Sequence, residues 1–403
     1  MRLKLHVGLH KTATTSIQQT LSRNRDLLAR NGWNYPVVLN ERDRQFPNHA
    51  MPFYAAFLES YRGRQQLLSR GYEESWARPM FRERLAEAVR SGDRVLMSGE
   101  GISLLAAPEL AEVRRFFDDL GVALDPICFV RSPSEMAASG MQENIKHGHK
   151  FMLKPVRKFD AIERLKAELG HLETYPFARA KRHPLGPVGF FIETLGLGDP
   201  EAFEIFRKND SMSDRATRLI GFVNRVQPIS ADRKPNPHRF YDDARPLWDL
   251  PGRKFVFTEG EQQVLYERIM EENEKYRQVL GPEYCDDGTE SAPVADAWSE
   301  EASAFVAAAL PDLNPLLWPA VCLYLEVTPG IAPALADPVT ETVLRLLPEH
   351  GDLVRKGLDF DEEALRNSAR FVSLASGTTV RPGEIIRAAR RVEERIAGAL
   401  AQS

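Results

Sequence analysis

A lysine and four hydroxyl-bearing side chains lie close together between residues 10 and 16, in the sequence HKTATTS. Before them, Leu3, Leu5 and Val7 alternate with polar residues, which is the period of a strand. After them, Ile17 and Leu21 have the spacing of one helix face. A loop that leads from a strand into a helix presents the positive N-terminal end of that helix, so we predict a site for a phosphate-like group. The candidate residues are His10, Lys11, Thr12, Ala13, Thr14, Thr15 and Ser16.

The order of these residues differs from the phosphate loop of nucleoside triphosphatases. That loop reads G-x-x-x-x-G-K-[ST], with the lysine directly after a glycine. Here His10 precedes Lys11, and the hydroxyl groups follow the lysine. The order resembles the 5′-phosphosulfate loop of sulfotransferases, which typically reads K-x-G-T-T and binds 3′-phosphoadenosine-5′-phosphosulfate (PAPS). Ala13 stands where that loop has glycine, and the alternative for this segment alone is an ordinary helix start after a strand.

A second motif, RSPSEMAAS, begins at Arg131 directly after the apolar segment 127–130. Ser132, Pro133 and Glu135 have the pattern of a capped helix start, so Arg131 is expected at the end of a strand. Arginine binds phosphate oxygens with two parallel hydrogen bonds. Sulfotransferases carry R-x-P with a serine eight residues after the arginine, and that pair holds the 3′-phosphate of PAPS. Arg131 and Ser139 keep this spacing.

The two motifs together resemble the PAPS-dependent sulfotransferases over about residues 1–285. The resemblance implies an α/β fold of the P-loop type, with three layers and a central parallel sheet. It also implies that PAPS is the co-substrate and that a sulfuryl group passes to a hydroxyl of a small-molecule or carbohydrate acceptor, with no metal required.

Two residues are candidates for proton transfer, and Lys11 is the candidate for stabilising the leaving group. Glu100 follows a short predicted strand at 94–98 and lies between two glycines. The resemblance implies that the strand between the two cofactor motifs delivers the catalytic base, and the alternative is a solvated turn glutamate. His49 is expected either to approach the acceptor or to pack beside the helix that follows it.

Composition describes an ordinary globular chain of 403 residues, 43% hydrophobic and 27% charged, with a net charge of −4. The acidic excess lies in residues 286–403, which carry 19 acidic and 10 basic side chains. The remaining weak basic bias suits a negatively charged nucleotide cofactor and does not indicate nucleic-acid binding. We expect no membrane span and no secretory leader. Three cysteines without pairing or metal-binding spacing favour a cytoplasmic protein.

The segment from Gly281 through the polar residues 285–293 is the expected domain boundary. It separates a PAPS-binding catalytic domain, residues 1–285, from a helical domain, residues 294–403, suited to homo-oligomer formation or partner binding. Helical periodicity predicts segments 298–310, 314–327, 339–347, 361–376 and 382–400. A basic cluster is either a solvated face or a site for an anionic acceptor or the nucleotide phosphates; it comprises Lys146, His147, His149, Lys150, Lys154, Arg157 and Lys158.

Two other functions are compatible with these motifs. A nucleotide kinase of similar fold is disfavoured by the absence of G-K-[ST] and by the Arg131 and Ser139 pair. A non-catalytic relative that only binds is favoured by Ala13, because alanine is strained by about 1 kcal/mol or more wherever the backbone requires a positive φ.

Overall fold

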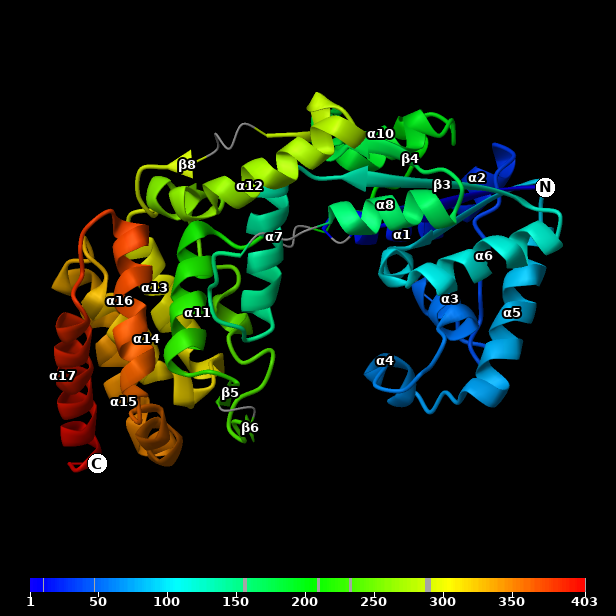
Figure 1. Ribbon diagram of the computed structural model, residues 1–403. Coiled ribbons are helices and arrows are strands. Elements are labelled where there is room, and N and C mark those ends of the chain that lie inside the picture. The colour runs from blue at the N-terminus through cyan, green and yellow to red at the C-terminus, as the bar shows by residue number, and fades with distance from the viewer. Residues whose placement is uncertain are drawn as a thin grey trace. The chain divides into compact units, whose positions relative to one another are not determined.

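The computed structural model describes residues 1–9, 11–46, 48–154, 158–208, 211–231, 234–286 and 291–402 (Figure 1). The chain forms two compact units. Unit 1 contains Met1–Pro133, Arg157–Asn209 and Glu271–Asp286, and unit 2 contains Ser134–Val156, Asp210–Met270 and Asp287–Ser403. Among the described residues, no helix has both the length and the apolar composition that a bilayer-spanning helix needs.

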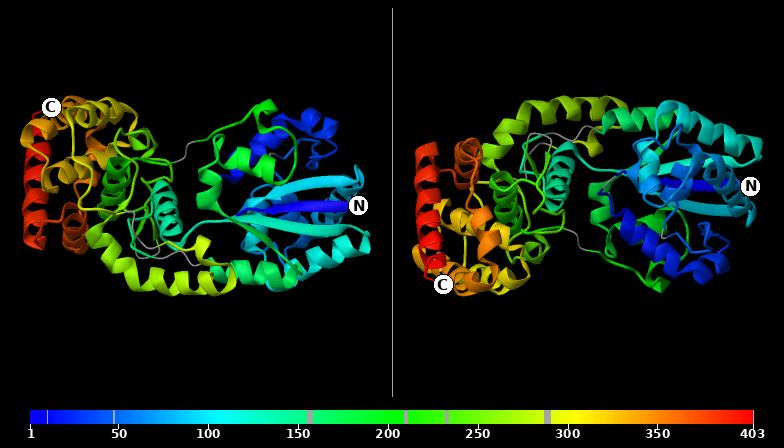
Figure 2. Two further views of the ribbon diagram at one scale, coloured as in Figure 1. Left: turned by 90° about the horizontal axis from the view of Figure 1, so that it is seen from above. Right: turned by 90° about the horizontal axis from the view of Figure 1, so that it is seen from below.

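Unit 1 is mixed α/β and contains a four-stranded parallel sheet. The strand order is β2-β1-β3-β4, and β1, dark blue in Figure 2, lies inside the sheet. The strands are β1 (Arg2–Val7), β2 (Arg94–Gly99), β3 (Ala123–Val130) and β4 (Glu173–Pro176). This confirms the α/β class and the parallel sheet, whereas the P-loop type and its three layers remain predictions.

Two apolar cores, one on each face of the sheet, hold unit 1 together. Leu3, Leu5 and Val7 of β1 belong to one core, and Leu96 and Ile127 from the neighbouring strands belong to the other. The first core contains α3 (Ala50–Phe57), α5 (Glu74–Arg90), α6 (Ala107–Asp119) and α8 (Phe159–Glu168). The second contains α1 (Thr14–Arg23), α2 (Arg25–Arg30) and α10 (Gly186–Thr194). Two shorter α-helices, α4 (Gln65–Leu68) and α9 (Phe177–Lys181), also lie in this unit.

Unit 2 is mainly helical and has a single large apolar core. It contains α7 (Pro133–Lys146), apart from its first residue, α11 (Asp214–Val226), α13 (Glu300–Ala309), α14 (Trp318–Val327), α15 (Pro333–Gly357), α16 (Glu362–Ser376) and α17 (Pro382–Leu400). Its short strand pairs are β5 (Ser230–Ala231) with β6 (Lys234–Pro235), and β7 (Phe257–Thr258) with β8 (Ser291–Ala292). Helix α12 (Glu259–Val279) begins in unit 2 and ends in unit 1.

This division of the chain differs from the expected boundary near residue 285. Helix α7 contributes Ala137, Met141 and Ile145 to the core that α14 fills with Leu323 and Leu325. Helix α11, which is almost completely buried, belongs to the same core. The helices after residue 294 therefore share their apolar faces with earlier segments, and removing them would expose those faces to water.

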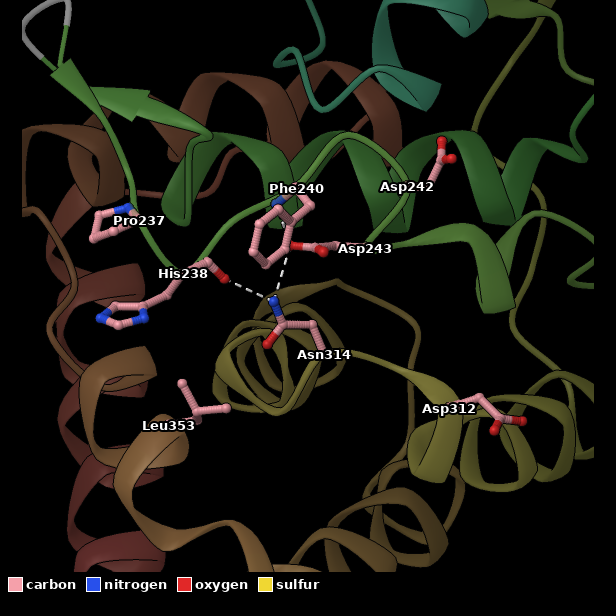
Figure 3. A pocket seen from close by; sticks show the side chains of 8 residues that line it. All are labelled: Pro237, His238, Phe240, Asp242, Asp243, Asp312, Asn314 and Leu353. Carbon is pink, nitrogen blue, oxygen red and sulfur yellow. Dashed lines mark hydrogen bonds between the residues drawn. The ribbon is translucent and has the colours of Figure 1, made fainter.

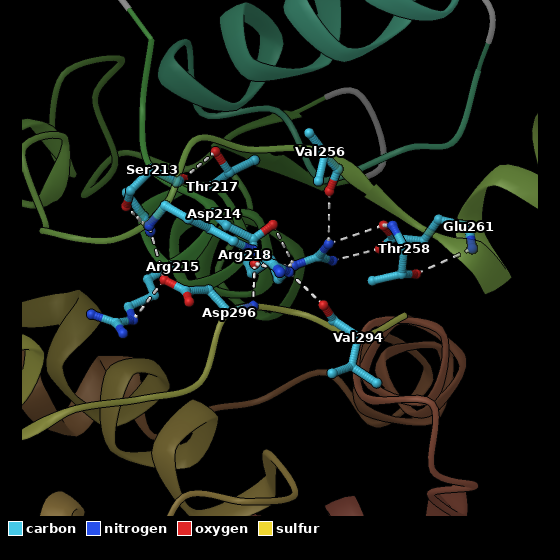
Figure 4. Close-up of polar contacts among 12 residues, drawn as sticks. Ser213, Asp214, Arg215, Thr217, Arg218, Val256, Thr258, Glu261, Val294 and Asp296 are labelled. Atoms are coloured by element: carbon cyan, nitrogen blue, oxygen red, sulfur yellow. Dashed lines mark hydrogen bonds and ion pairs between the residues drawn. The ribbon is translucent and has the colours of Figure 1, made fainter. Parts of the chain in front are cut away.

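A buried ion network connects three segments of unit 2 (Figure 4). The Arg218 guanidinium donates to Asp214 at 3.1 Å and to the two oxygens of Glu261 at 2.5 and 3.0 Å. Asp214 also accepts a hydrogen bond from the backbone N–H of Asp296 at 2.6 Å. Burial alone would lower the pKa of Arg218, but the carboxylates of Glu261 and Asp214 outweigh this effect and raise it. Helix α11 and the start of α12 are thus joined through charges that lie out of water, and the segment that leads to α13 is joined to them through the Asp296 backbone N–H.

We expect Arg218→Ala to destabilise unit 2 by about 3–5 kcal/mol, because Glu261 would remain buried without its cation and Asp214 would keep only the more distant Arg253, at 3.8 Å. The matched control is Arg366→Ala on α16, whose partner Glu362 is exposed, and a change below about 1 kcal/mol is expected there. Hydrogen exchange of the α11 and α14 amides measures both effects. Equal protection in the two variants would contradict a stabilising role for the network.

Candidate functional site

The carboxyl ends of the four parallel strands meet at one edge of the sheet, where α/β proteins place their ligands. Val7 pairs with Gly99 in register, so the loop that begins at Gly8 starts beside Glu100. A side chain at Gly8 would clash with the Thr14 methyl group and would lie 3.1 Å from the Glu100 Cα. The absence of a Cβ at this glycine therefore allows the loop, the first turn of α1 and Glu100 to come together.

The loop enters α1 through a strained backbone. Lys11 has φ 68° and Ala13 has φ 60° and ψ 20°, both in the left-handed region that residues with a side chain rarely adopt. The Ala13 carbonyl accepts the first helical hydrogen bond, from Ile17 N–H at 3.0 Å. No side chain caps the N-terminus of α1, and the first turn contains no acidic residue. The positive end of the helix dipole is therefore not offset by a local carboxylate of the helix itself.

Ala13→Gly should stabilise unit 1 by about 0.5–1 kcal/mol. Glycine removes a left-handed strain of about 1–2 kcal/mol, and its greater freedom in the unfolded chain offsets only part of this gain. The control is Ala29→Gly in α2, which is exposed and should instead cost about 1 kcal/mol. Hydrogen exchange of the α1 and α2 amides provides the comparison. A loss of protection in Ala13→Gly as large as in Ala29→Gly would contradict the strain.

The four hydroxyl groups of the loop have different surroundings. Thr12 is fully buried and donates to the Leu9 carbonyl at 2.5 Å, and Thr14 is also buried. Ser16 accepts a hydrogen bond from the backbone N–H of Lys208 at 3.2 Å. Thr15 is exposed. Thr12 therefore shapes the loop, and Thr15 is the threonine of this loop whose side chain faces solvent.

Helix α1 also holds the segment 203–208 along one of its faces. Thr20 accepts from the backbone N–H of Phe206 at 2.9 Å, and Asn24 accepts from that of Glu204 at 3.0 Å. With Ser16, these residues are four apart and so lie on one side of the helix. This row brings Lys208 to the first turn of α1, an arrangement that the periodicity of the sequence does not reveal.

Glu100 begins a short 3-10 helix (Glu100–Leu104) directly after β2, and both flanking glycines are required by close contacts. A Cβ at Gly99 would lie 3.0 Å from the Ala50 nitrogen, and one at Gly101 would lie 2.6 Å from the Tyr54 ring. Burial lowers the pKa of Lys158, and the Glu100 carboxylate partly opposes this effect. Glu100 thus has a partly buried cation in its neighbourhood, and the sequence placed that lysine only in a diffuse basic cluster.

Of the two alternatives for His49, approach to an acceptor or packing beside the following helix, the contacts favour a structural role. It is 3% exposed, and its Nδ1 accepts from the Ser98 backbone N–H at 3.1 Å. The ring proton therefore lies on Nε2 and is donated to the Pro36 carbonyl at 3.1 Å. Both ring nitrogens are engaged by backbone groups, so His49 ties β2 to the start of α3 and to the segment around Pro36.

A second buried histidine, His6 of β1, lies on the other side of Ser98. Its Nδ1 is 2.8 Å from the Ser98 hydroxyl, to which Gln18 of α1 also donates at 3.2 Å. Burial lowers the pKa of His6 to about 4, an effect that the Glu100 carboxylate only partly offsets. Burial likewise lowers the pKa of His49 to about 4. Both imidazoles are therefore neutral in the folded protein at neutral pH.

Unit 1 should lose stability as the pH falls from about 6.5 to about 4. In this window the unfolded chain binds protons at His6 and His49 while the folded chain does not, at a cost of about 1.4 kcal/mol per pH unit for each histidine. Above about pH 6.5 both histidines are neutral in the folded and in the unfolded chain, so the folded protein keeps its full stability. Hydrogen exchange of the β1 and β2 amides, corrected for the intrinsic exchange rates, measures how steeply the free energy of unfolding changes with pH. His6→Gln should remove about half of this pH dependence, whereas the exposed His171→Gln should leave it unchanged.

Arg131 lies at the end of β3, and its guanidinium stacks on the ring of Phe177 with 4.4 Å to the ring centroid. Phe177 begins α9 directly after β4, which pairs with β3 through Val130 and Pro176. Two adjacent strands therefore orient this arginine. Ser139 lies on α7 in unit 2, so Arg131 and Ser139 belong to different units and their joint action remains a prediction.

Two of the residues singled out from the sequence, His10 and Arg157, lie outside the described residues. Of the described basic cluster, Lys158 belongs to unit 1, and the other members belong to unit 2. Lys146 places its amine 5.1 Å from the centre of the Trp248 ring. Within the described ranges, no group of three His, Cys, Asp or Glu side chains is arranged to hold a metal ion.

Comparison of the chain with protein-family models, with curated proteins and with solved structures found no match. The function is therefore inferred from the site itself. At one edge of the parallel sheet the site combines a strained loop with a lysine, a helix N-terminus, a carboxylate and an arginine.

Proposed function

We propose that this protein transfers a sulfuryl group from PAPS to a hydroxyl group of a small-molecule or carbohydrate acceptor. The observation that carries the proposal is the close packing at Gly8, which brings the helix N-terminus and Glu100 together at the same edge of the sheet. An anion held by the loop would then lie near a carboxylate able to accept a proton. The free cysteines Cys128, Cys285 and Cys322 are consistent with a cytoplasmic setting, which is part of the proposal.

The proposed reaction is an in-line displacement at sulfur. The bond between sulfur and the bridging oxygen breaks, a bond forms between sulfur and the acceptor oxygen, and 3′-phosphoadenosine-5′-phosphate leaves. Lys11 and the first amides of α1 would stabilise the charge that builds on the departing phosphate. Because Thr12 is committed to the Leu9 carbonyl, Thr15 is a better candidate than Thr12 for a side-chain contact with the cofactor.

Glu100 is the proposed base that accepts the proton of the acceptor hydroxyl. Lys158 is close enough for the two charges to affect each other, and a neighbouring cation favours the ionised carboxylate that this role needs. His49 is set aside as a base because both of its ring nitrogens are occupied. Arg131, held by Phe177, would bind the 3′-phosphate, with Ser139 as its proposed partner.

A non-catalytic binding function is the second candidate, and Ala13 is the observation that favours it. Its left-handed backbone is one that glycine adopts without strain and alanine does not. A chain that keeps the loop for binding alone tolerates such strain as long as the anion site is formed.

The cofactor assignment can be tested by ligand-induced thermal shift of the full chain. We expect 3′-phosphoadenosine-5′-phosphate to stabilise the protein far more than AMP, because Arg131 would engage only the former through the 3′-phosphate. At a hundred times its dissociation constant a ligand adds about 2.7 kcal/mol. Arg131→Ala should remove the preference between the two nucleotides, whereas the exposed Arg94→Ala should retain it. Equal shifts with AMP in the wild-type chain would overturn the assignment.

Catalysis can be separated from binding by Glu100→Gln, measured through release of 3′-phosphoadenosine-5′-phosphate from PAPS, with water as the surrogate acceptor. Turnover should fall about 10²–10⁴-fold while nucleotide affinity stays the same. Lys11→Ala should weaken both. The exposed Glu201→Gln is the control and should change neither. A chain that binds the nucleotide but never turns over PAPS, with or without an acceptor panel, would support the non-catalytic function.

A further inference from the structure

Unit 2 contains a pocket of about 570 Å³ that is separate from the residues discussed so far. Its volume lies in the usual range of small-molecule sites, about 300–1,000 Å³. Figure 3 shows the ring of Phe240 beside Asn314 and Asp243, with His238 and Leu353 on one side of Asn314 and Asp312 on the other. Pro237 and Asp242 complete the lining.

The loop that carries Phe240 is held by buried hydrogen bonds. Arg239, 5% exposed, donates to the Gln227 carbonyl at 2.9 Å and to the Asn224 side chain at 2.8 Å. Its third contact is Asp243 at 3.0 Å. Despite this anchoring, Phe240 remains 65% exposed. A rigid loop that keeps a large aromatic ring in water is typical of a binding surface, because little conformational entropy is lost when a ligand covers the ring.

The side chain of Asp243 gives the second sign of a ligand. Its Oδ2 atom accepts three hydrogen bonds, from Arg239, from the Phe240 backbone N–H and from Asn314, at 2.8–3.0 Å. Within the described structure Oδ1 accepts none, although the side chain is only 7% exposed and lines the pocket. A fixed acceptor with unused capacity is thus available to a ligand hydroxyl group.

The pocket also provides a donor. The Lys356 amine is 3.0 Å from Nε2 of His238 and donates to it, so the ring proton of His238 lies on Nδ1. The three lining carboxylates, on Asp242, Asp243 and Asp312, disfavour an anionic ligand. Lys356 beside His238 and Arg239 beside Asp243 offset two of these three negative charges, so the pocket does not strongly favour a cationic ligand either. The ligand that best suits the pocket is therefore a neutral ring with hydroxyl groups around its edge and a C–H face that can stack on the Phe240 ring.

We propose that this pocket binds one neutral sugar ring, stacked on Phe240 and hydrogen-bonded to Asp243 Oδ1 and His238 Nδ1. The site belongs to unit 2 alone and does not depend on the proposed sulfuryl transfer. A nucleotide is not expected to compete for it, because the phosphates would meet the aspartates.

Saturation-transfer NMR of the full chain with methyl β-D-glucopyranoside and methyl β-D-galactopyranoside tests the proposal. At least one of the two should receive saturation, and D-glucuronate and tetramethylammonium at the same concentration should not. Phe240→Ser should weaken binding about tenfold, a typical effect of removing an aromatic contact. Tyr241→Ser is the matched control, since Tyr241 is adjacent and 63% exposed but does not line the pocket, and its affinity change should stay within twofold.

Three outcomes would contradict the proposal. Binding of tetramethylammonium or D-glucuronate without either glycoside would overturn the neutral-sugar assignment. Equal losses in Phe240→Ser and Tyr241→Ser would place any binding outside the pocket, and no saturation of either glycoside would overturn the site. Both substitutions replace exposed rings, so unchanged melting of the variants should accompany the test. The response to 3′-phosphoadenosine-5′-phosphate should be unchanged in Phe240→Ser, which keeps this test distinct from that of the sulfotransferase proposal.

Discussion

A single buried serine connects the elements that hold the loop after β1 and Glu100 at one edge of the sheet in unit 1. Ser98 receives His6 from β1 and Gln18 from α1 at its hydroxyl, and His49 at its backbone N–H. Each of these polar groups is removed from water and would cost about 1–3 kcal/mol if it lost its partner. The network therefore fixes β1, β2, α1 and α3 in one arrangement. Because Glu100 follows β2 and the loop joins β1 to α1, this network also fixes the positions of Glu100 and the loop.

The loop tolerates backbone strain because the elements around it are held firmly. Lys11 and Ala13 keep left-handed backbones between a strand inside the sheet and a helix locked by Gln18 and the 203–208 segment. Such conformations persist only where neighbouring structure over-determines them, and they are concentrated at functional sites. The nearby Gly99 and Gly101 serve a different purpose, since they admit close contacts from α3.

Local patterns predicted β1, β2, the end of β3, the helix starts after the loop and after Arg131, and helices after residue 294, because these depend on residues near in sequence. The same patterns could not show that α7 belongs to the core of the C-terminal helices, since that contact joins residues far apart in the chain. Prolines also misled the boundaries: Pro338 and Pro348 both lie within α15, which is much longer than the predicted segment 339–347. The role of His49 depends on a strand 49 residues away, and the pocket beside Phe240 depends on Asn314, so neither was visible in the sequence.

The interleaving of the two units constrains how the chain matures on the ribosome. The last segment of unit 1 is residues 271–286, which are made after much of unit 2. The core of unit 2 cannot be completed before its C-terminal helices leave the ribosome. The nascent sheet must wait for Tyr276 and Tyr284 to cover part of one face, while the apolar sides of α7 and α11 stay open until translation is nearly complete. Newly made chains should therefore depend on chaperones that shield apolar surface until release, more than a protein whose domains follow one another along the sequence.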